Sequence, residues 1–453
     1  MEKQTRENQR RWAPQRSRSG WATEHQALMR RTRGLRIPPW SIPLAYSVGA
    51  IVMGLVLPRI ESRWLPGWGL PLSTSAAIAI DSSVASGMIA LTGIVFALAF
   101  VMVQFGSVAY SPRLVPWIAG DPILMHSIGI FNATFLYALA ALAWVDRRDS
   151  VQVPFLSTAF VVILLVVSVG VFVGLVQRLS SLQVHRVLIF AAEQGRRVID
   201  GLYPPLDASP ATRVDAESFH LPLTQTLTDT GRPMAIQAID TQALFDLACA
   251  SGGLIEMVSA VGDTVGEGKV LLRVYGAREK IAESELLRAI VLGNERTFEQ
   301  DPKYAILILA DIAIRALSPA INDPATAVQA LDHIEDLLLR VGRRRLESGD
   351  FRDQAGEVRL ILPVPEWEDF LNLGLAEIRH YGADSLRVMR RMRALLADLL
   401  VALPSERRRS LRQERDRLDA IINRTFEDDE EILLASVEDR QGLGASRRPH
   451  VGA

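Results

Sequence analysis

The chain lacks most of the residues on which metal sites, disulfide frameworks and nucleophilic enzymes depend. Its 453 residues include one cysteine, Cys249, which excludes an internal disulfide and every zinc site with several thiolates. The seven histidines are scattered, and no two of them have HExxH or HxH spacing. There is no Walker loop, because Gly268-Lys269 is followed by Val270. We therefore expect no enzymatic activity, no metal ion and no other cofactor.

The chain also lacks an excess of charge of either sign. It has 50 basic and 51 acidic residues, so nothing attracts it as a whole to nucleic acid, and we expect no nucleic-acid partner. Charge is uneven only locally, since residues 1–39 carry ten Lys and Arg. We expect this basic N-terminal arm to be mostly disordered, with contact to anionic lipid headgroups as the alternative.

Four apolar runs contain no Lys, Arg, Asp or Glu, whose insertion at the bilayer centre costs about 2.5–3.5 kcal/mol each. Each run is long enough to cross about 30 Å of hydrocarbon. The runs are residues 40–57, 84–105, 123–145 and 153–176. They predict an α-helical integral membrane protein with four spans, in a transmembrane domain over residues 40–176.

The basic residues that flank the spans predict the orientation. The ten basic residues of the arm exceed those of the loops that follow, where the first loop has Arg59 and Arg63 and the second has Arg113. Basic residues close to spans stay in the cytoplasm, and an even number of spans places both termini on one side. We therefore expect a multi-pass protein of the cell membrane whose N and C termini are cytoplasmic.

The rest of the chain predicts a cytoplasmic α+β domain that is mainly helical and contains a small β-subdomain. Strands are expected at 233–239, 253–261, 268–275 and 357–362, and helices at 241–250, 284–294, 304–317, 324–341, 367–403 and 407–426. The Arg-rich stretch 387–424 is expected to form a solvated face, with anionic lipid or a protein partner as alternatives. The expected parts are a connecting helix (177–203), a linker (204–232), a small β-rich subdomain (233–276), a helical domain (277–426) and an acidic, disordered tail (427–453).

Several segments resemble a family of bacterial predicted membrane proteins, the domain of unknown function family 2254. The most specific are ERTFEQDP and LSPAINDP within residues 293–339, and others are residues 110–114, the turn GDTVGEGKVL (262–271) and ILPVPEWEDFLNLGLAEIRHYG (361–382). Together with the four spans, the resemblance covers residues 40 to about 425. It implies a membrane protein and little about activity. Ala320 stands where the family form SPGINDP has glycine, which puts in doubt a turn with positive φ at that position.

Charged and amide residues of this signature form the first candidate site, namely Glu295, Arg296, Glu299, Asp311, Arg315, Asn322 and Asp323. Asp311 and Arg315 are four residues apart on an otherwise apolar helix, so we expect them to be buried and paired. Asp323 and Pro324 fit a helix N-cap and first turn, where free N–H groups also suit an anion. Our leading interpretation is a buried charged network that fixes a subunit interface. The alternative is a metal or ligand site built from Glu295, Glu299, Asp311 and Asp323.

The second candidate site is a face of small residues on the second span. These residues recur at helical spacing and are Ser82, Ser86, Ala90, Gly93 and Ala97. Such a face suits either close helix packing or the wall of an aqueous path. Four spans enclose too little space for a pore, so transport requires several subunits around an axis. We therefore expect self-association into a homo-oligomeric, channel-like or transport assembly regulated by its cytoplasmic domain. The alternative is a membrane-anchored sensor or scaffold whose cytoplasmic domain binds a partner.

Overall fold

The computed structural model describes residues 38, 40–64, 69–70, 73–109, 122–146, 153–179, 184–206, 220–346 and 349–444. The basic arm, the 110–114 segment and residues 445–453 therefore lie outside the described residues. The chain forms two compact units, one over residues 36–187 and one that begins at residue 188. We call them the bundle and the C-terminal unit.

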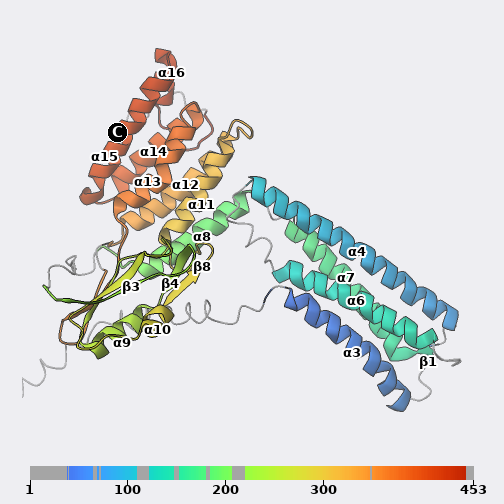
Figure 1. The fold of residues 1–453 in the computed structure, drawn as a ribbon. Coiled ribbons are helices and arrows are strands. Elements are labelled where there is room, and N and C mark those ends of the chain that lie inside the picture. Colours follow the sequence, from blue (N-terminus) through green and yellow to red (C-terminus); the bar gives the residue numbers. More distant parts are fainter. Residues whose placement is uncertain are drawn as a thin grey trace, which may run out of the picture. The chain divides into compact units, whose positions relative to one another are not determined.

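Four long helices make up the bundle (Figure 1). They are α3 (Ser41–Trp64), α4 (Thr74–Ala109), α6 (Pro122–Asp146) and α7 (Phe155–Leu179). Among the described residues, these four helices are long and apolar enough to cross a membrane. The four predicted spans are thus confirmed as candidate membrane helices.

The ends of two spans differ from the prediction, and the difference changes their chemistry. The α4 span begins at Thr74 and includes Asp81, and the α3 span reaches Glu61. Both carboxylates lie beyond the apolar runs that the sequence marked out, because those runs end where charge appears. The candidate spans are therefore longer than the predicted runs at these two ends.

The bundle helices pack closely, and one end of the bundle is tied by a short ladder. A Cβ at Gly54 of α3 would lie 2.5 Å from the Cβ of Ala140 on α6, so only glycine permits this approach. The connection between α3 and α4 contains β1 (Gly69–Leu70), and the one between α6 and α7 contains β2 (Val153–Pro154). These two strands pair antiparallel. The ladder therefore marks the end of the bundle where α3 and α6 finish and α4 and α7 begin.

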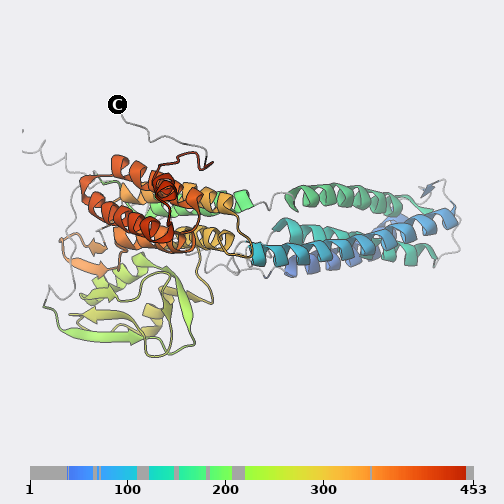
Figure 2. The same ribbon diagram turned by 90° about the horizontal axis from the view of Figure 1, so that it is seen from above.

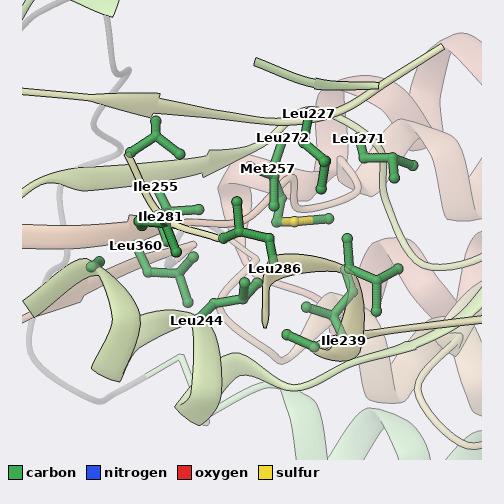
Figure 3. Packing of buried hydrophobic residues seen from close by; sticks show 14 of the residues in the cluster. Leu227, Ile239, Leu244, Ile255, Met257, Leu271, Leu272, Ile281, Leu286 and Leu360 are labelled. Carbon is green, nitrogen blue, oxygen red and sulfur yellow. The ribbon is translucent and has the colours of Figure 1, made fainter. Parts of the chain in front are cut away.

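The C-terminal unit contains two sheets. The five-stranded sheet has the order β3-β7-β5-β10-β9, and the three-stranded sheet has the order β6-β4-β8. The strands are β3 (Leu223–Thr228), β4 (Met234–Ile239), β5 (Leu254–Met257), β6 (Thr264–Val265), β7 (Val270–Tyr275), β8 (Ile290–Gly293), β9 (Asp350–Arg352) and β10 (Val358–Ile361). Two short helices accompany them, α9 (Thr241–Ser251) and α10 (Glu283–Arg288). Apolar side chains from both sheets and both helices share one core, of which Figure 3 shows a part, including Ile255, Leu272 and Leu286.

This β-region extends well beyond residues 233–276. Strand β3 lies inside the stretch expected to be a linker, so that expectation is wrong for Leu223–Thr228. Strand β10 pairs in parallel with β5, with Leu360 opposite Ile255, and β9 follows it at the edge. Residues 290–293 form β8, although they were expected to continue a helix. Apolar residues such as those of β8 suit either structure, and pairing between distant strands decides the outcome.

Helices form the other part of the C-terminal unit, and Figures 1 and 2 show them to one side of the strands. They are α8 (Val184–Leu202), α11 (Pro302–Ala316), α12 (Pro324–Gly342), α13 (Trp367–Tyr381), α14 (Leu386–Ala402), α15 (Ser405–Thr425) and α16 (Asp429–Ala435). The predicted connecting helix appears as α8, whose Leu188 and Ile199 are fully buried. A Cβ at Gly195 of α8 would contact Ala305 of α11 and Leu337 of α12 within 3 Å. Helix α8 is therefore part of the core of this unit.

Two helical expectations need correction. Residues 367–403 form two helices, because α13 ends at Tyr381 and Gly382 is packed against Val388 and the carbonyl of Ile378. The tail was expected to be disordered, but α16 forms within it and Ala435 is buried. Within the described residues, the chain is therefore ordered up to residue 444.

The Arg-rich stretch is only partly a solvated face. Arg390 is 1% exposed and donates to the carbonyls of Val437 and Gly444. Arg391 is also buried and pairs with Asp332 of α12 at 2.7 Å. Because Arg390 holds the segment after α16 against α14, these arginines contribute to the fold of the C-terminal unit.

Candidate functional site

Asp81 is the least solvated acid of the bundle. Its side chain is 0% exposed, and neither carboxylate oxygen has a hydrogen-bond partner among the described residues. It lies on α4, roughly 10 Å along the helix axis from Thr74 at about 1.5 Å per residue. Acids inside membrane helices are costly and typically mark a functional site.

Glu61, on α3, is the second buried acid and has a different environment. Its carboxylate accepts hydrogen bonds from the backbone N–H groups of Leu156 at 2.9 Å and Ser157 at 3.3 Å. These two groups belong to the first turn of α7, where backbone N–H groups have no partner within the helix. The first turn also carries the positive end of the helix dipole, which suits the acceptor oxygens of Glu61.

Tyr137 of α6 shares Ser157 with Glu61 as a hydrogen-bond partner. Its side chain is fully buried, and its hydroxyl lies 3.1 Å from the Oγ of Ser157. Glu61 and Asp81 are both close enough to Tyr137 for a Coulombic interaction. We call Glu61, Asp81, Tyr137 and Ser157 the acid cluster. Each of the four bundle helices contributes one of its residues, near the end that the β1–β2 ladder closes.

The small-residue face of α4 lies on the outside of the bundle. All five predicted residues are exposed, namely Ser82, Ser86, Ala90, Gly93 and Ala97. The opposite face of α4 is buried, with Val84, Met88 and Val95 in the core of the bundle. Within the described residues, the small residues therefore lie outside the core of the bundle, on a surface that a neighbouring helix, lipid or water can reach.

In the C-terminal unit, the signature residues form an ion pair at the start of α11. Arg296 Nε lies 2.7 Å from Asp301 Oδ2, and Asp301 is 2% exposed. Asp301 also caps α11 by accepting the N–H of Lys303. Burial raises the pKa of Asp301, and the positive charge of Arg296 opposes that shift. Asp301 is the buried partner of this pair, although it was not among the predicted site residues.

The GDTVGEGKVL turn reaches this ion pair. Gly262 has a φ of +91°, and a Cβ there would collide with the guanidinium of Arg296 and the carboxylate of Asp301. The N–H of Gly262 donates to the carbonyl of Ile236 on β4, which holds the turn in place. Two segments that resemble the family signature therefore meet at one point.

The other predicted network residues do not gather around this pair. Glu295 is exposed, whereas Glu299 is half-buried with its Oε2 enclosed and without a hydrogen-bond partner among the described residues. Asp311 and Arg315 are half-buried, so the expectation that they are fully inside is wrong. No three His, Cys, Asp or Glu side chains in the described part of the chain could hold a metal ion. The four carboxylates suggested as an alternative site are thus not brought together as metal ligands.

Asp323 caps α12, as its sequence position indicates. Its Oδ1 accepts the N–H groups of Ala325 and Thr326, and its Oδ2 accepts the Thr326 hydroxyl at 2.6 Å. The left-handed conformation in this turn belongs to Asn322, with a φ of 48°, and not to Ala320. Asparagine tolerates that region better than most residues, so alanine at position 320 leaves the turn intact.

A small cavity lies beside Asp301, between the strands and the helices of the C-terminal unit. Its volume is about 110 Å³, and its lining includes Tyr203, Gln300, Asp301, Lys303 and Phe351. Burial raises the pKa of the Tyr203 hydroxyl, and the nearby Asp301 charge adds to the shift. Both functional groups of the Gln300 amide bond to Ile239. The cavity is well below the roughly 300 Å³ at which small-molecule pockets begin.

Comparison with known proteins places the chain in a family. A family model described as a predicted membrane protein, DUF2254, matches residues 38–398. The chain belongs to this family. Uncharacterised proteins of Mycobacterium bovis and Mycobacterium tuberculosis are each 28% identical to it over 383 residues, which cover 80% of this chain and 70% of each relative. No solved structure matches the chain.

The family match confirms the resemblance that the signature segments carry. It includes all four candidate spans, the acid cluster and the Arg296–Asp301 pair. The chain is therefore a membrane protein of this family, and the acid cluster and the outer face of α4 are its candidate functional features.

Proposed function

We propose that the protein is a homo-oligomeric transport or channel-like assembly of the cell membrane, in which copies pack through the outer face of α4. The proposal rests on the burial of the bulky face of α4 and the exposure of its small-residue face. The bulky face fills the core of its own bundle, and the face that contains Ser86, Ala90 and Gly93 is exposed. Small residues let membrane helices approach closely, so this face suits a second copy of the chain.

The core of a single bundle leaves little room for a path. Phe131, Tyr137 and Val161 are fully buried in it, together with Val95 of α4. A route across the membrane would therefore run between copies arranged around an axis, where Ser82 and Ser86 would supply hydroxyl groups. We further propose that the C-terminal unit lies in the cytoplasm and regulates the assembly.

The acid cluster supports transport over simple anchoring. An anchor has no need of acids inside its spans, and each one is costly there. The competing function is a membrane-anchored sensor or scaffold, which the separate core of the C-terminal unit would suit. In that case the outer face of α4 would contact lipid only.

Cross-linking distinguishes the two functions. With the exposed Cys249 replaced by serine, single cysteines are introduced as Ser86→Cys and Gly93→Cys in the full chain. Ile94→Cys is the matched control, because Ile94 is exposed and next to Gly93 but turned about 100° around the helix. We expect cross-linked species with the first two variants and none with the control.

The mass of the detergent-purified complex completes the test. We expect a multiple of the chain mass of 50.0 kDa. A monomer, or equal cross-linking of all three variants, would contradict the proposed assembly and favour the anchored module. Reaction of Ser86→Cys with a membrane-impermeant thiol reagent would in addition place the face beside water.

A further inference from the structure

The two acids of the bundle have opposite environments although they belong to one cluster. Glu61 receives two backbone N–H groups from the first turn of α7. Asp81 is fully buried and receives no hydrogen bond from the described residues. Donors stabilise the charged form of a carboxyl group, and burial without donors stabilises the neutral form. The environment of Asp81 therefore favours its protonated form.

None of the other described groups of the bundle donates a hydrogen bond to the Asp81 carboxylate. On α3, the Arg59 guanidinium lies over the Trp144 ring of α6 at 5.2 Å from its centroid. On α6, the uncharged hydroxyl of Tyr137 forms a hydrogen bond with the Ser157 hydroxyl. On α7, the buried polar groups Ser157 and Thr158 are uncharged, and α4 has no other charged residue between Thr74 and Val101.

We propose that Asp81 is a proton-binding site of the bundle, and that the proton is the species whose binding is coupled to transport. The coupling rests on the proposed function, whereas protonation of Asp81 does not. A buried acid that takes up a proton loses its charge, and a buried acid that releases the proton needs new donors or water. Binding and release of one proton would thus favour different arrangements of α4 against α6 and α7.

Carbodiimide labelling tests protonation directly. Dicyclohexylcarbodiimide is apolar, enters the membrane and reacts with carboxylic acids in their protonated form. The acid O–H adds across one C=N bond, and the product rearranges to a stable N-acylurea that keeps every atom of the reagent. Labelled peptides of the full chain, reconstituted in vesicles, are then identified by mass spectrometry.

We expect Asp81 to be labelled at about pH 7, where an ordinary aspartate with a pKa near 3.9 is almost fully ionised. Asp81→Asn should lose the label, and Glu61→Gln should retain it at Asp81, so that the second variant controls for access of the reagent. Absence of label at Asp81 in the wild-type chain between about pH 5 and about pH 8 would overturn the proposal.

Further arms separate this proposal from the proposed function. Protection of Asp81 by Na⁺ at constant pH would show that a metal cation occupies the site, and would overturn the assignment to a proton. Labelling of Asp81 in a protein that is monomeric would leave the proton site standing and remove the transport assembly. An oligomeric protein whose Asp81 is never labelled would leave the transport assembly standing and remove the proton site.

Discussion

Gly262 is the residue at which the turn of the β-region meets the ion pair of α11. Its positive φ of +91° disfavours any side chain, and the space where a Cβ would lie is taken by Arg296 and Asp301. Gly268, in the same turn, has a similar φ of +80° with nothing within 4 Å of an added Cβ. A substitution at Gly268 therefore introduces backbone strain alone, whereas one at Gly262 introduces backbone strain and a steric collision.

Gly262→Ala should destabilise the C-terminal unit more than Gly268→Ala does. Both substitutions carry the strain of positive φ, which is about 1 kcal/mol or more. Only the first also displaces the buried Arg296–Asp301 pair, so we expect a total loss of about 3 kcal/mol or more for Gly262→Ala. Thermal unfolding of the purified variants measures the difference. Equal melting temperatures would show that the contact with the ion pair is unimportant.

At the scale of elements, Glu61 links α3 to the start of α7. Glu61→Gln keeps a carbonyl acceptor for one of the two backbone N–H groups, places an NH2 donor against the other and removes the charge that favours the helix dipole, so we expect a loss of about 1–3 kcal/mol. Glu61→Leu leaves two buried N–H groups without an acceptor and should cost about 1–3 kcal/mol for each of them. Unfolding of the two variants in the same detergent measures this order. A Glu61→Leu variant as stable as Glu61→Gln would contradict the described contacts.

Helices with a local start signal could be predicted from the sequence. Asp301-Pro302 and Asp323-Pro324 place a capping carboxylate before a proline, and α11 and α12 begin there. The four long helices of the bundle were equally clear, since their apolar length alone indicates them. The residues that cause these helices to form lie next to one another in the sequence, either in a short cap or in one apolar run.

Elements that depend on distant partners were missed or misjudged. β8 was expected to be part of a helix, and its strand structure follows from pairing with β4, which lies much earlier in the chain. The break between α13 and α14 follows from the packing of Gly382 against Val388, whereas the apolar pattern continues across it. α16 lies in an acidic stretch that suggested disorder, although Ile432 and Leu434 offered a weak signal of a buried face.

The side chains of the candidate site in the bundle could also be predicted only in part, because their burial depends on how the helices pack. The five small residues of α4 were found from their spacing, but only the packed bundle shows that they face outward. Asp81 was overlooked because the apolar run was drawn to exclude charge, and its burial depends on the packing of α4 against α6 and α7. A search for acids within one or two turns of an apolar run would have found both Asp81 and Glu61.

At the scale of the whole molecule, the orientation of the bundle decides which side of the membrane the acid cluster serves. The cluster lies near the end that contains β1 and β2. If both termini are cytoplasmic, as the ten basic residues of the arm favour, this end faces away from the cytoplasm. A proton that reaches Asp81 would then cross the shorter distance from the outer side.

Reporter fusions at two points test this orientation. We expect alkaline phosphatase, which is active only outside the cytoplasm, to be active when fused after Leu70 in β1 and inactive when fused after Ala453. A fluorescent protein that folds in the cytoplasm should give the reverse pattern at the same two positions. The paired reporters guard against loss of signal through poor expression, because each site then has one active fusion. The opposite pattern would place the acid cluster at the cytoplasmic end, and Asp81 would then exchange its proton with the side that holds the C-terminal unit.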